Sequence, residues 1–258
     1  MNTKSFGFIG GGRITRIMLE GFSRAGFNPA KIIVSDINLE ILEKLKTDYP
    51  GIIISQDNSM PVQADIIFIA LHPPAFNEFL NNIKEEIDSD QILISLIPKI
   101  KIERISGALN GFNRIIRMNP NAATIIDEGY NPVTFSISFS EIEKMELLKF
   151  FSIFGFCPEV EEHKLEVFAV ITAMGPTYFW FQIYELMKIA KSFGLNEEEV
   201  NCGIAKMVTG AVDTIFKSKL PAETVMNLVP VRPLEQEEDN IKKIFRTKIN
   251  LIYNKLTN

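Results

Sequence analysis

Three consecutive glycines near the start of the chain are the first residues whose spacing could do chemistry. They lie in GFIGGGRITRIML (residues 7–19), between a short apolar run and a stretch with helical spacing. Gly10 and Gly12 fit the first two positions of the G-x-G-x-x-G fingerprint, where glycine permits a tight turn and lets a pyrophosphate approach a helix N-terminus. Thr15 occupies the third position, usually Gly or Ala, so we expect a slightly wider spacing between helix and strand. The stretch predicts a dinucleotide-binding turn.

A carboxylate ends the next apolar run, KIIVSD (31–36). Asp36 at this point could bind the two ribose hydroxyls of NAD. It would repel the 2′-phosphate of NADP by about 4 kcal/mol at a separation of ~4 Å and an effective dielectric of ~20. No arginine follows at positions 37 or 38 to bind a phosphate, so we expect NAD to be favoured over NADP. The alternative is that Asp36 only caps the following helix.

The elements that would position these residues alternate along the chain. Strands are predicted at residues 4–9, 31–36, 51–55, 65–71, 91–97, 114–118 and 131–138, several of them apolar throughout, as in strands buried on both faces. Helices are predicted at 12–25, 38–48 (with Asn38 as cap), 75–87 and 141–155. Residues 157–162 could form an edge strand. This alternation predicts an α/β fold with a doubly wound, mostly parallel sheet of the Rossmann type.

The later part of the chain predicts helices only, at residues 164–192, 196–216, 221–228 and 235–256. We therefore expect a dinucleotide-binding domain over residues 1–162 and an all-helical domain over 163–258. The apolar stretch 167–190 has almost the length of a membrane span, but it contains Pro176, Glu185 and Lys188. We expect a fully buried helix instead, and no membrane contact.

Composition excludes several classes of function. A net charge of −5, with scattered Lys and Arg, argues against a nucleic-acid partner. The two cysteines, Cys157 and Cys202, form no disulfide framework, so we expect buried thiols in a reducing cytoplasm. We expect no secretory signal, because the apolar run near the N-terminus is short. His72 and His163 lie far apart without ligand spacing, so no metal site is expected.

Four segments together resemble the Δ1-pyrroline-5-carboxylate reductases, over roughly residues 5–245. FGFIGGGRITRIMLEGF resembles the family's opening helix, and ADIIFIALHPPAF its fourth strand, which ends here in His72-Pro73 instead of Lys-Pro. IIRMNPNAATIIDEGYNPVTFS resembles the R-x-M-P-N-T-P segment, and VITAMGPTYFWF resembles S-G-S-G-P-A-Y. The residues retained in the last two segments are Arg117, Pro120, Asn121, Gly129, Gly175, Pro176 and Tyr178.

This resemblance implies an NAD(P)H-dependent reductase that transfers hydride to the C=N bond of a small cyclic imino acid, as in proline biosynthesis. It also implies a homodimer through the C-terminal helices, with active sites between one subunit's nucleotide domain and the partner's helices. A partner helix would supply the burial that the apolar stretch 167–190 needs. The cofactor contacts that we expect are Gly10, Gly11, Gly12, Arg13, Ile14, Asp36, Leu71, His72, Pro73, Asn119 and Asn121.

The substrate segments depart from the family's pattern. The family's S-P-G-G-T-T segment, which helps hold the substrate carboxylate, is replaced by NLVPVRPLEQEE from Asn227. Met174 replaces a small polar residue, while Thr172 keeps a hydroxyl where the family has Ser. Asn119 stands in place of Met, and Ala122 in place of Thr. The pattern indicates a retained cofactor site and a rewritten substrate site.

Three side chains are candidates for the catalytic chemistry. Arg232, in the rewritten segment, could clamp a carboxylate, or it could be a surface residue between two prolines. Thr172 and Thr177 could donate to a carboxylate or an imine nitrogen, although Thr177 could instead bond its own helix backbone. Beside them, His72 at a strand end could contact the nicotinamide or donate a proton, and we favour the cofactor contact.

Three hypotheses follow from these observations. The first is an NAD(P)-dependent reductase of a pyrroline-carboxylate-like imine. The second is an oxidoreductase of the same fold that acts on a different small acid, which the loss of S-P-G-G-T-T favours. The third is a dinucleotide-binding protein without catalysis.

Overall fold

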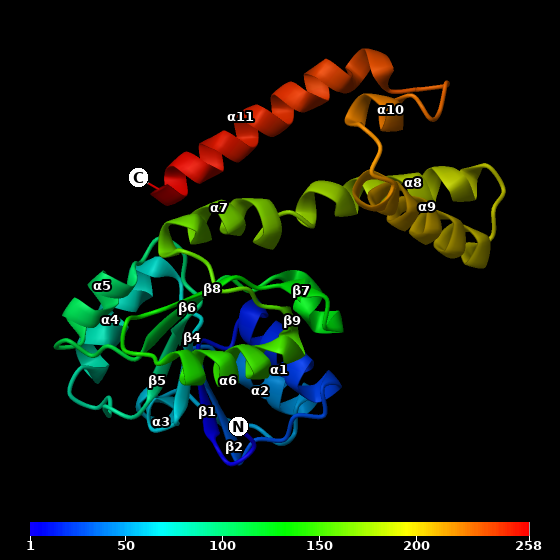
Figure 1. The fold of residues 1–258 in the computed structure, drawn as a ribbon. Helices are drawn as coiled ribbons and strands as arrows, with labels where there is room; N and C mark the ends of the chain where they lie inside the picture. The colour runs from blue at the N-terminus through cyan, green and yellow to red at the C-terminus, as the bar shows by residue number, and fades with distance from the viewer. Residues whose placement is uncertain (258) are drawn as a thin grey trace. The chain divides into compact units, whose positions relative to one another are not determined.

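A seven-stranded sheet organises the first part of the computed structural model, which describes residues 1–257, without the side chains of residues 73 and 74 (Figure 1). The strand order is β3-β2-β1-β4-β5-β6-β8, in which all pairs are parallel except β6 with β8. The strands are β1 (Ser5–Ile9), β2 (Lys31–Ser35), β3 (Ile53–Ser55), β4 (Ile66–Ile69), β5 (Ile92–Ser95), β6 (Ile115–Met118) and β8 (Val133–Phe135). The predicted doubly wound, mostly parallel Rossmann-type fold is confirmed.

Helices cover both faces of this sheet. The helices that pack on one face are α1 (Arg13–Arg24), α2 (Leu39–Asp48) and α6 (Glu141–Phe151). Those on the other are α3 (Ser59–Val62), α4 (Pro73–Ile83) and α5 (Ile102–Ala108). The sequence analysis predicted α1, α2, α4 and α6 but neither α3 nor α5, which are one or two turns long. Asn38 caps α2 as expected, because its side chain accepts hydrogen bonds from the backbone N–H groups of Glu40 and Ile41.

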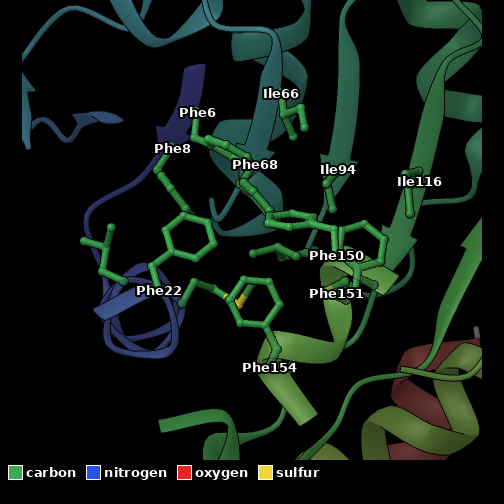
Figure 2. Close-up of a cluster of buried hydrophobic side chains, with 14 of the residues drawn as sticks. Phe6, Phe8, Phe22, Ile66, Phe68, Ile94, Ile116, Phe150, Phe151 and Phe154 are labelled. Carbon is green, nitrogen blue, oxygen red and sulfur yellow. The ribbon is translucent and has the colours of Figure 1, made fainter. Parts of the chain in front are cut away.

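An aromatic cluster holds α1 and α6 against the sheet (Figure 2). Phe8 and Phe68, on adjacent strands, stack with ring centroids 4.8 Å apart. Phe22 of α1 meets Phe6 edge-on at 5.3 Å and stacks on Phe154 beyond α6. Offset and edge-to-face pairs such as these add to the free energy of apolar burial. They fix α1 on the sheet, and therefore fix the turn that precedes it.

The order of the strands creates a switch point between β1 and β4. The chain leaves β1 through α1 toward β2 on one side, and it returns to β4 on the other side. The carboxyl ends stay level, since the Gly10 N–H donates to the Ser35 carbonyl and the Ala70 N–H donates to the Ile9 carbonyl, each at 2.8 Å. In open α/β sheets ligands bind at such a crevice.

The segment after α6 differs from its prediction. The helix ends at Phe151, followed by a 3₁₀ turn (Ser152–Phe154) and a short strand β9 (Gly155–Phe156) that pairs with β7 (Gly129–Tyr130). No edge strand forms over residues 157–162, where only Glu159 bridges to Val133. Gly155 has φ of +109°, and a Cβ atom there would lie 2.3 Å from the Gly129 carbonyl oxygen. A Cβ atom on Gly129 would in turn lie 2.5 Å from the Phe154 carbonyl oxygen, so both residues of this β7–β9 pair must be glycine.

The predicted helix over residues 164–192 is wrong as one continuous element. The structure has a 3₁₀ turn (Glu162–Lys164), α7 (Leu165–Phe168), a π-helix (Ala169–Ala173) and then α8 (Thr177–Ser192). Pro176 separates the last two because proline lacks the N–H that would continue the backbone ladder. The remaining helices are α9 (Glu197–Lys217), α10 (Ala222–Met226), a 3₁₀ turn (Glu235–Glu237) and α11 (Glu238–Thr257).

The chain divides into two compact units. The first contains Met1–Met174 and the end of the chain from Tyr253, and the second contains Gly175–Ile252. Residues 163–174, which the sequence prediction assigned to the helical domain, therefore group with the sheet. Their grouping reflects contacts of Glu166 and Thr172 with β6 and the segment after it. The predicted domain boundary at residue 162 remains a prediction.

Two burial predictions are wrong within this chain. Helix α8 has no buried residues, although the stretch was expected to be a fully buried helix; Phe181 is 67% exposed. Cys157 is buried as expected but Cys202 is exposed, because it lies off the α8–α9 groove, which Ile183, Met187 and Ile204 line. Within residues 1–257, no helix combines the length and the apolar character that crossing a membrane requires.

Candidate functional site

The glycine turn after β1 is shaped by contacts that only glycine permits. Gly10 is buried with φ of +98°, and a Cβ atom there would lie 2.8 Å from the Ala70 carbonyl oxygen. A Cβ on Gly11 would lie 3.2 Å from the side chains of Ile41 and Leu45. Gly12 differs, because a Cβ there would meet nothing within 4 Å. The protein's own packing therefore requires glycine at position 10 and crowds a side chain at position 11, while the space beside Gly12 is open.

Helix α1 begins at this open space. Gly12 is its N-cap residue, no side chain caps its N-terminus, and its first turn contains no acidic residue. The backbone N–H groups of the first turn, from Arg13 and Ile14 onward, are the donors that a helix leaves without intrahelical partners. Together with the helix dipole they favour an anion at this end.

Thr15 shows how the third fingerprint position is filled without glycine or alanine. The residue is fully buried, and its Oγ1 donates a hydrogen bond to the Gly10 carbonyl at 2.5 Å. The hydroxyl thus stabilises the turn that the glycines form. The expected widening between helix and strand stays a prediction.

Asp36 braces the same turn from the neighbouring strand. Its Oδ2 accepts from the Gly11 N–H at 2.8 Å, and its Oδ1 accepts from the Asn38 N–H at 2.9 Å. The alternative that Asp36 caps α2 is wrong, since Asn38 performs that role. An ionised carboxylate offers about four lone-pair sites, so two hydrogen bonds leave acceptor capacity for ribose hydroxyls.

A cleft of about 580 Å³ lies above this turn. Its size falls within the range of typical small-molecule sites, roughly 300–1,000 Å³. Its lining combines the turn, the end of β4, the loop into α2, and one face of α4. The lining residues are Gly10, Gly12, Asp36, Ile37, Asn38, Ile41, Asn58, Ala70, Leu71, His72, Ala75, Glu78, Phe79 and Asn82.

The structure brings together five of the eleven predicted cofactor contacts. Gly10, Gly12, Asp36, Leu71 and His72 line one cleft. The sequence analysis did not predict that helix α4 lines this cleft, with its residues at positions 75, 78, 79 and 82. These positions lie on one face of a helix, and this spacing could have identified them once the helix was known to begin beside the switch point.

His72 immediately precedes α4. It is the N-cap residue with extended backbone, its side chain makes no capping hydrogen bond, and it is exposed in the cleft lining. An imidazole in this position can reach a bound molecule. The predicted contact of Pro73 lies outside the side chains that the structure describes.

The two predicted asparagines after β6 do not line the cleft. Asn119 and Asn121 are buried, and their amides donate to the carbonyls of Leu165 and Thr172 respectively. Both hydrogen bonds fasten the segment around α7 to the end of β6. Their predicted contact with a cofactor therefore stays a prediction.

A buried ion-pair cluster beside these asparagines was not predicted. Arg117 of β6 is only 1% exposed, and its guanidinium pairs with Glu162 at 3.0 Å and with Glu166 at 2.6 Å. A charged residue inside the apolar strand IIRM indicates that a partner must exist. The partner was not identifiable from sequence because it lies 49 positions away.

The three candidate catalytic residues occupy different surroundings. Thr172 is half-buried in the π-helix, where its Oγ1 donates to the Phe168 carbonyl at 2.8 Å. Thr177 is the first residue of α8 and belongs to the second unit. Arg232, in that same unit, pairs with Glu235 at 2.9 Å and also with Glu238. Neither Thr177 nor Arg232 is among the residues that line the cleft.

Comparisons with known proteins agree with this geometry. Residues 5–99 match the family described as "NADP oxidoreductase coenzyme F420-dependent". The chain is 26% identical to the pyrroline-5-carboxylate reductase of Methanosarcina acetivorans, over 88% of this chain and 82% of that protein. It is 27% identical to pyrroline-5-carboxylate reductase 2 of Bacillus subtilis, over 83% and 78% of the two chains.

A solved structure shares the whole fold. The pyrroline carboxylate reductase of Plasmodium falciparum, crystallised with NADP bound, aligns with a TM-score of 0.84 at 21% identity, over 99% of this chain and 97% of that one. Prephenate dehydrogenase from A. aeolicus shares the fold more loosely, with a TM-score of 0.56 at 14% identity, over 97% and 99% of the two chains. The chain is thus similar in sequence to pyrroline-5-carboxylate reductases along most of its length, and it shares their fold.

Proposed function

We propose that this protein is an NAD(P)H-dependent reductase that transfers hydride to the C=N bond of a small cyclic imino acid. The observation that carries the proposal is the cleft at the β1–β4 switch point, with an open glycine position on its floor and Asp36 on its rim. The curated relatives are named for the reduction of pyrroline-5-carboxylate. Together, these findings support both a dinucleotide site and the class of reaction.

The cleft residues fit a nicotinamide dinucleotide. The diphosphate would lie against Gly12 and the N–H groups of Arg13 and Ile14, where a side chain at position 12 would otherwise project. His72 would contact the nicotinamide half from its place at the N-terminus of α4. Bound there, a reduced nicotinamide would supply the hydride.

We infer a preference for NAD over NADP from Asp36. Its carboxylate can accept from two ribose hydroxyls, while a 2′-phosphate would meet it as a like charge. Glu78 lines the opposite wall of the same cleft and adds a second negative charge. Among the described residues that line the cleft, none is an arginine or a lysine.

Thr172 is the candidate that best fits the substrate in the first unit. Its hydroxyl proton is engaged by the Phe168 carbonyl, so its oxygen lone pairs are available to accept a hydrogen bond. A protonated imine nitrogen is such a donor. When hydride adds to the imine carbon, the C=N electron pair moves to nitrogen and yields the amine, so a protonated imine needs no further proton.

The substrate carboxylate would need a second group. We propose Thr177 and Arg232 for this role, in a domain that spans residues 163–258 and forms a homodimer. Exposed aromatic side chains on α8, including Phe179, Trp180 and Phe181, support a partner helix at this surface. Binding a carboxylate with Arg232 would require exchange with Glu235 or Glu238, because both pair with it now.

The replaced segment from Asn227 favours a second candidate function. NLVPVRPLEQEE lacks the paired glycines and the threonines that hold the substrate carboxylate in the family. An oxidoreductase of the same fold with a different small acid as substrate would explain that change. A dinucleotide-binding protein without catalysis is the remaining alternative. Both cysteines are free thiols, which fits the cytoplasmic location we propose.

One experiment separates these functions. The oxidation of NADH and of NADPH is followed separately with pyrroline-5-carboxylate as substrate. We expect turnover that is faster with NADH and that collapses in a Thr172→Val variant. Nucleotide binding with no turnover on this imine, other imines or hydroxy acids would instead favour the non-catalytic alternative.

A further inference from the structure

The segment that carries Thr172 is fastened across the carboxyl ends of β5 and β6 by buried side chains. Asn119 and Asn121 donate to its backbone at Leu165 and Thr172. Two carboxylates of the segment, Glu162 and Glu166, in turn extend from it toward Arg117 of β6. We call Arg117, Glu162 and Glu166 the arginine cluster.

Arg117 of β6 forms ion pairs with both carboxylates. Its Nη1 donates to Glu162 at 3.0 Å and its Nη2 donates to Glu166 at 2.6 Å. The same carboxylates also hold the loop after β5, because Glu162 accepts from the Ile102 N–H at 2.7 Å and Glu166 accepts from the Lys99 N–H at 3.2 Å. One guanidinium therefore fixes the end of β6, the loop after β5 and the segment around α7 in one arrangement.

The arginine cluster stabilises the fold only after a large desolvation cost is met. Arg117 is 1% exposed, its Nε has no hydrogen-bond partner among the described residues, and the cluster carries one more negative than positive charge. Burying such groups costs desolvation energy that apolar side chains of similar size would not cost. Compared with apolar packing, the charged side chains impose a defined geometry on the segments that they connect.

The element held by the cluster has the features of a functional segment. Residues Ala169–Ala173 form a π-helix, a rare conformation that often occurs at functional sites. It presents Thr172, whose backbone carbonyl is bound by Asn121. On the other side of the cluster, Lys99 adopts φ of +74°, which is unusual for a residue other than glycine.

We propose that Arg117 is a positioning residue for the reaction: through Glu162 and Glu166 it holds residues 162–173 so that Thr172 meets the substrate. The proposal rests on the proposed function. The arginine cluster connects β6 with α7 and with the 3₁₀ turn that precedes α7. None of its members lines the cofactor cleft, so Arg117 is not expected to contact the dinucleotide.

The test is a double substitution, Arg117→Met with Glu166→Met, which removes the arginine together with the more buried of its two carboxylates. Glu162 loses its partner, but its side chain is 27% exposed and therefore stays in contact with water. Because small misplacements of a reacting group cost about 100-fold in rate, we expect kcat/KM for pyrroline-5-carboxylate to fall by about 10- to 100-fold. The dissociation constant for NADH, measured by calorimetry, should change less than about twofold. Arg117→Lys, which keeps the charge but can bind only one carboxylate well, should be intermediate.

Arg114→Met is the matched control. Arg114 immediately precedes β6 and pairs with Glu143 at 2.9 Å, at the opposite end of the strand. Its loss should change stability without changing kcat/KM. If the double variant kept its kcat/KM, or lost NADH binding to the same extent as activity, a purely structural role would explain Arg117 and the proposal would be overturned.

Hydrogen exchange separates failure of this proposal from failure of the proposed function. In the double variant we expect amide protection to fall in residues 165–173 and to persist in β1 and β4. If the wild-type protein reduces no imine, the proposed function fails, and the exchange pattern still decides whether Arg117 holds this segment. Unchanged protection at 165–173 would overturn the proposal with or without enzymatic activity.

Discussion

At the scale of single residues, the three glycines of the first turn do different work. Gly10 is required by the protein's own packing and Gly11 leaves little room for a side chain, whereas Gly12 faces open space. The sequence fingerprint assigns the tight turn to Gly10 and the approach of a pyrophosphate to Gly12. The structure adds that a Cβ atom at position 12 would meet no protein atom within 4 Å, so a side chain there should leave the fold intact.

Gly12→Val is therefore expected to abolish dinucleotide binding while the protein stays folded. Gly12 has φ of −71° and ψ of −165°, which valine also adopts, and its Cβ would contact nothing within 4 Å. Calorimetry with NADH measures the binding, and thermal unfolding reports the fold. Gly51→Val is the control, because its Cβ position is equally open and lies before β3, away from the cleft. Undiminished binding in Gly12→Val would refute the placement of the diphosphate.

Asp36→Asn tests the selection of the nucleotide at the same scale. The substitution keeps the size of the side chain and removes the charge that a 2′-phosphate would meet. We expect the ratio of kcat/KM for NADPH to that for NADH to rise by about 10- to 100-fold, because salt screens the repulsion of about 4 kcal/mol. Glu40→Gln, an exposed acid of α2 outside the cleft lining, should leave the ratio unchanged. A ratio that does not move would remove Asp36 as the selecting residue.

At the scale of elements, strands were more predictable than helices. Apolar β-branched runs placed β4, β5 and β6 to within a few residues, because a strand buried on both faces admits little else. The break between the π-helix and α8 was missed although Pro176 was visible, since apolar periodicity continues across it. The contacts of Arg117 with Glu162 and Glu166 connect residues 45 and 49 positions apart, which local patterns do not encode.

Asp65 connects the starts of β1 and β4, and its titration predicts a pH dependence of stability. Burial opposes its ionisation, but hydrogen bonds from the Lys4 ammonium and from the hydroxyl and N–H of Ser5 outweigh this and lower the pKa of Asp65 to about 2. The unfolded chain has the ordinary value of 3.8. The stabilisation is therefore fully present above about pH 4 and is lost as the pH falls through about 2.

Asp65→Asn should lower the free energy of unfolding by about 1 kcal/mol at pH 7, a value reduced for solvent screening because the side chain is 36% exposed. Urea denaturation of both proteins should give a difference that shrinks as the pH approaches 2. The fully exposed Asp239 provides a control, in which Asn should have no effect at either pH. A difference that is constant with pH would show that charge at Asp65 does not stabilise the β1–β4 pair.

At the scale of the whole molecule, the main feature is a helical unit that leaves its aromatic side chains uncovered. Phe179, Phe181 and Tyr184 of α8 are each more than half exposed in the single chain. The sequence predicted a buried helix over the apolar stretch 167–190, and the family resemblance predicted a partner subunit that would cover it. Local sequence patterns carry no information on whether a partner subunit's helices contribute to the proposed active site.

Subunit mixing answers that question. In Gly12→Val the nucleotide site is lost, and in Thr177→Val a helical contribution to the substrate site is lost, so each homodimer should be inactive. If each active site combines one subunit's sheet with the partner's helices, a mixed dimer contains one site with both lesions and one intact site. Unfolding and refolding an equal mixture should then restore about a quarter of the wild-type activity, since about half of the dimers are mixed. A mixture that stays inactive, although it forms mixed dimers, would place each complete site within a single chain.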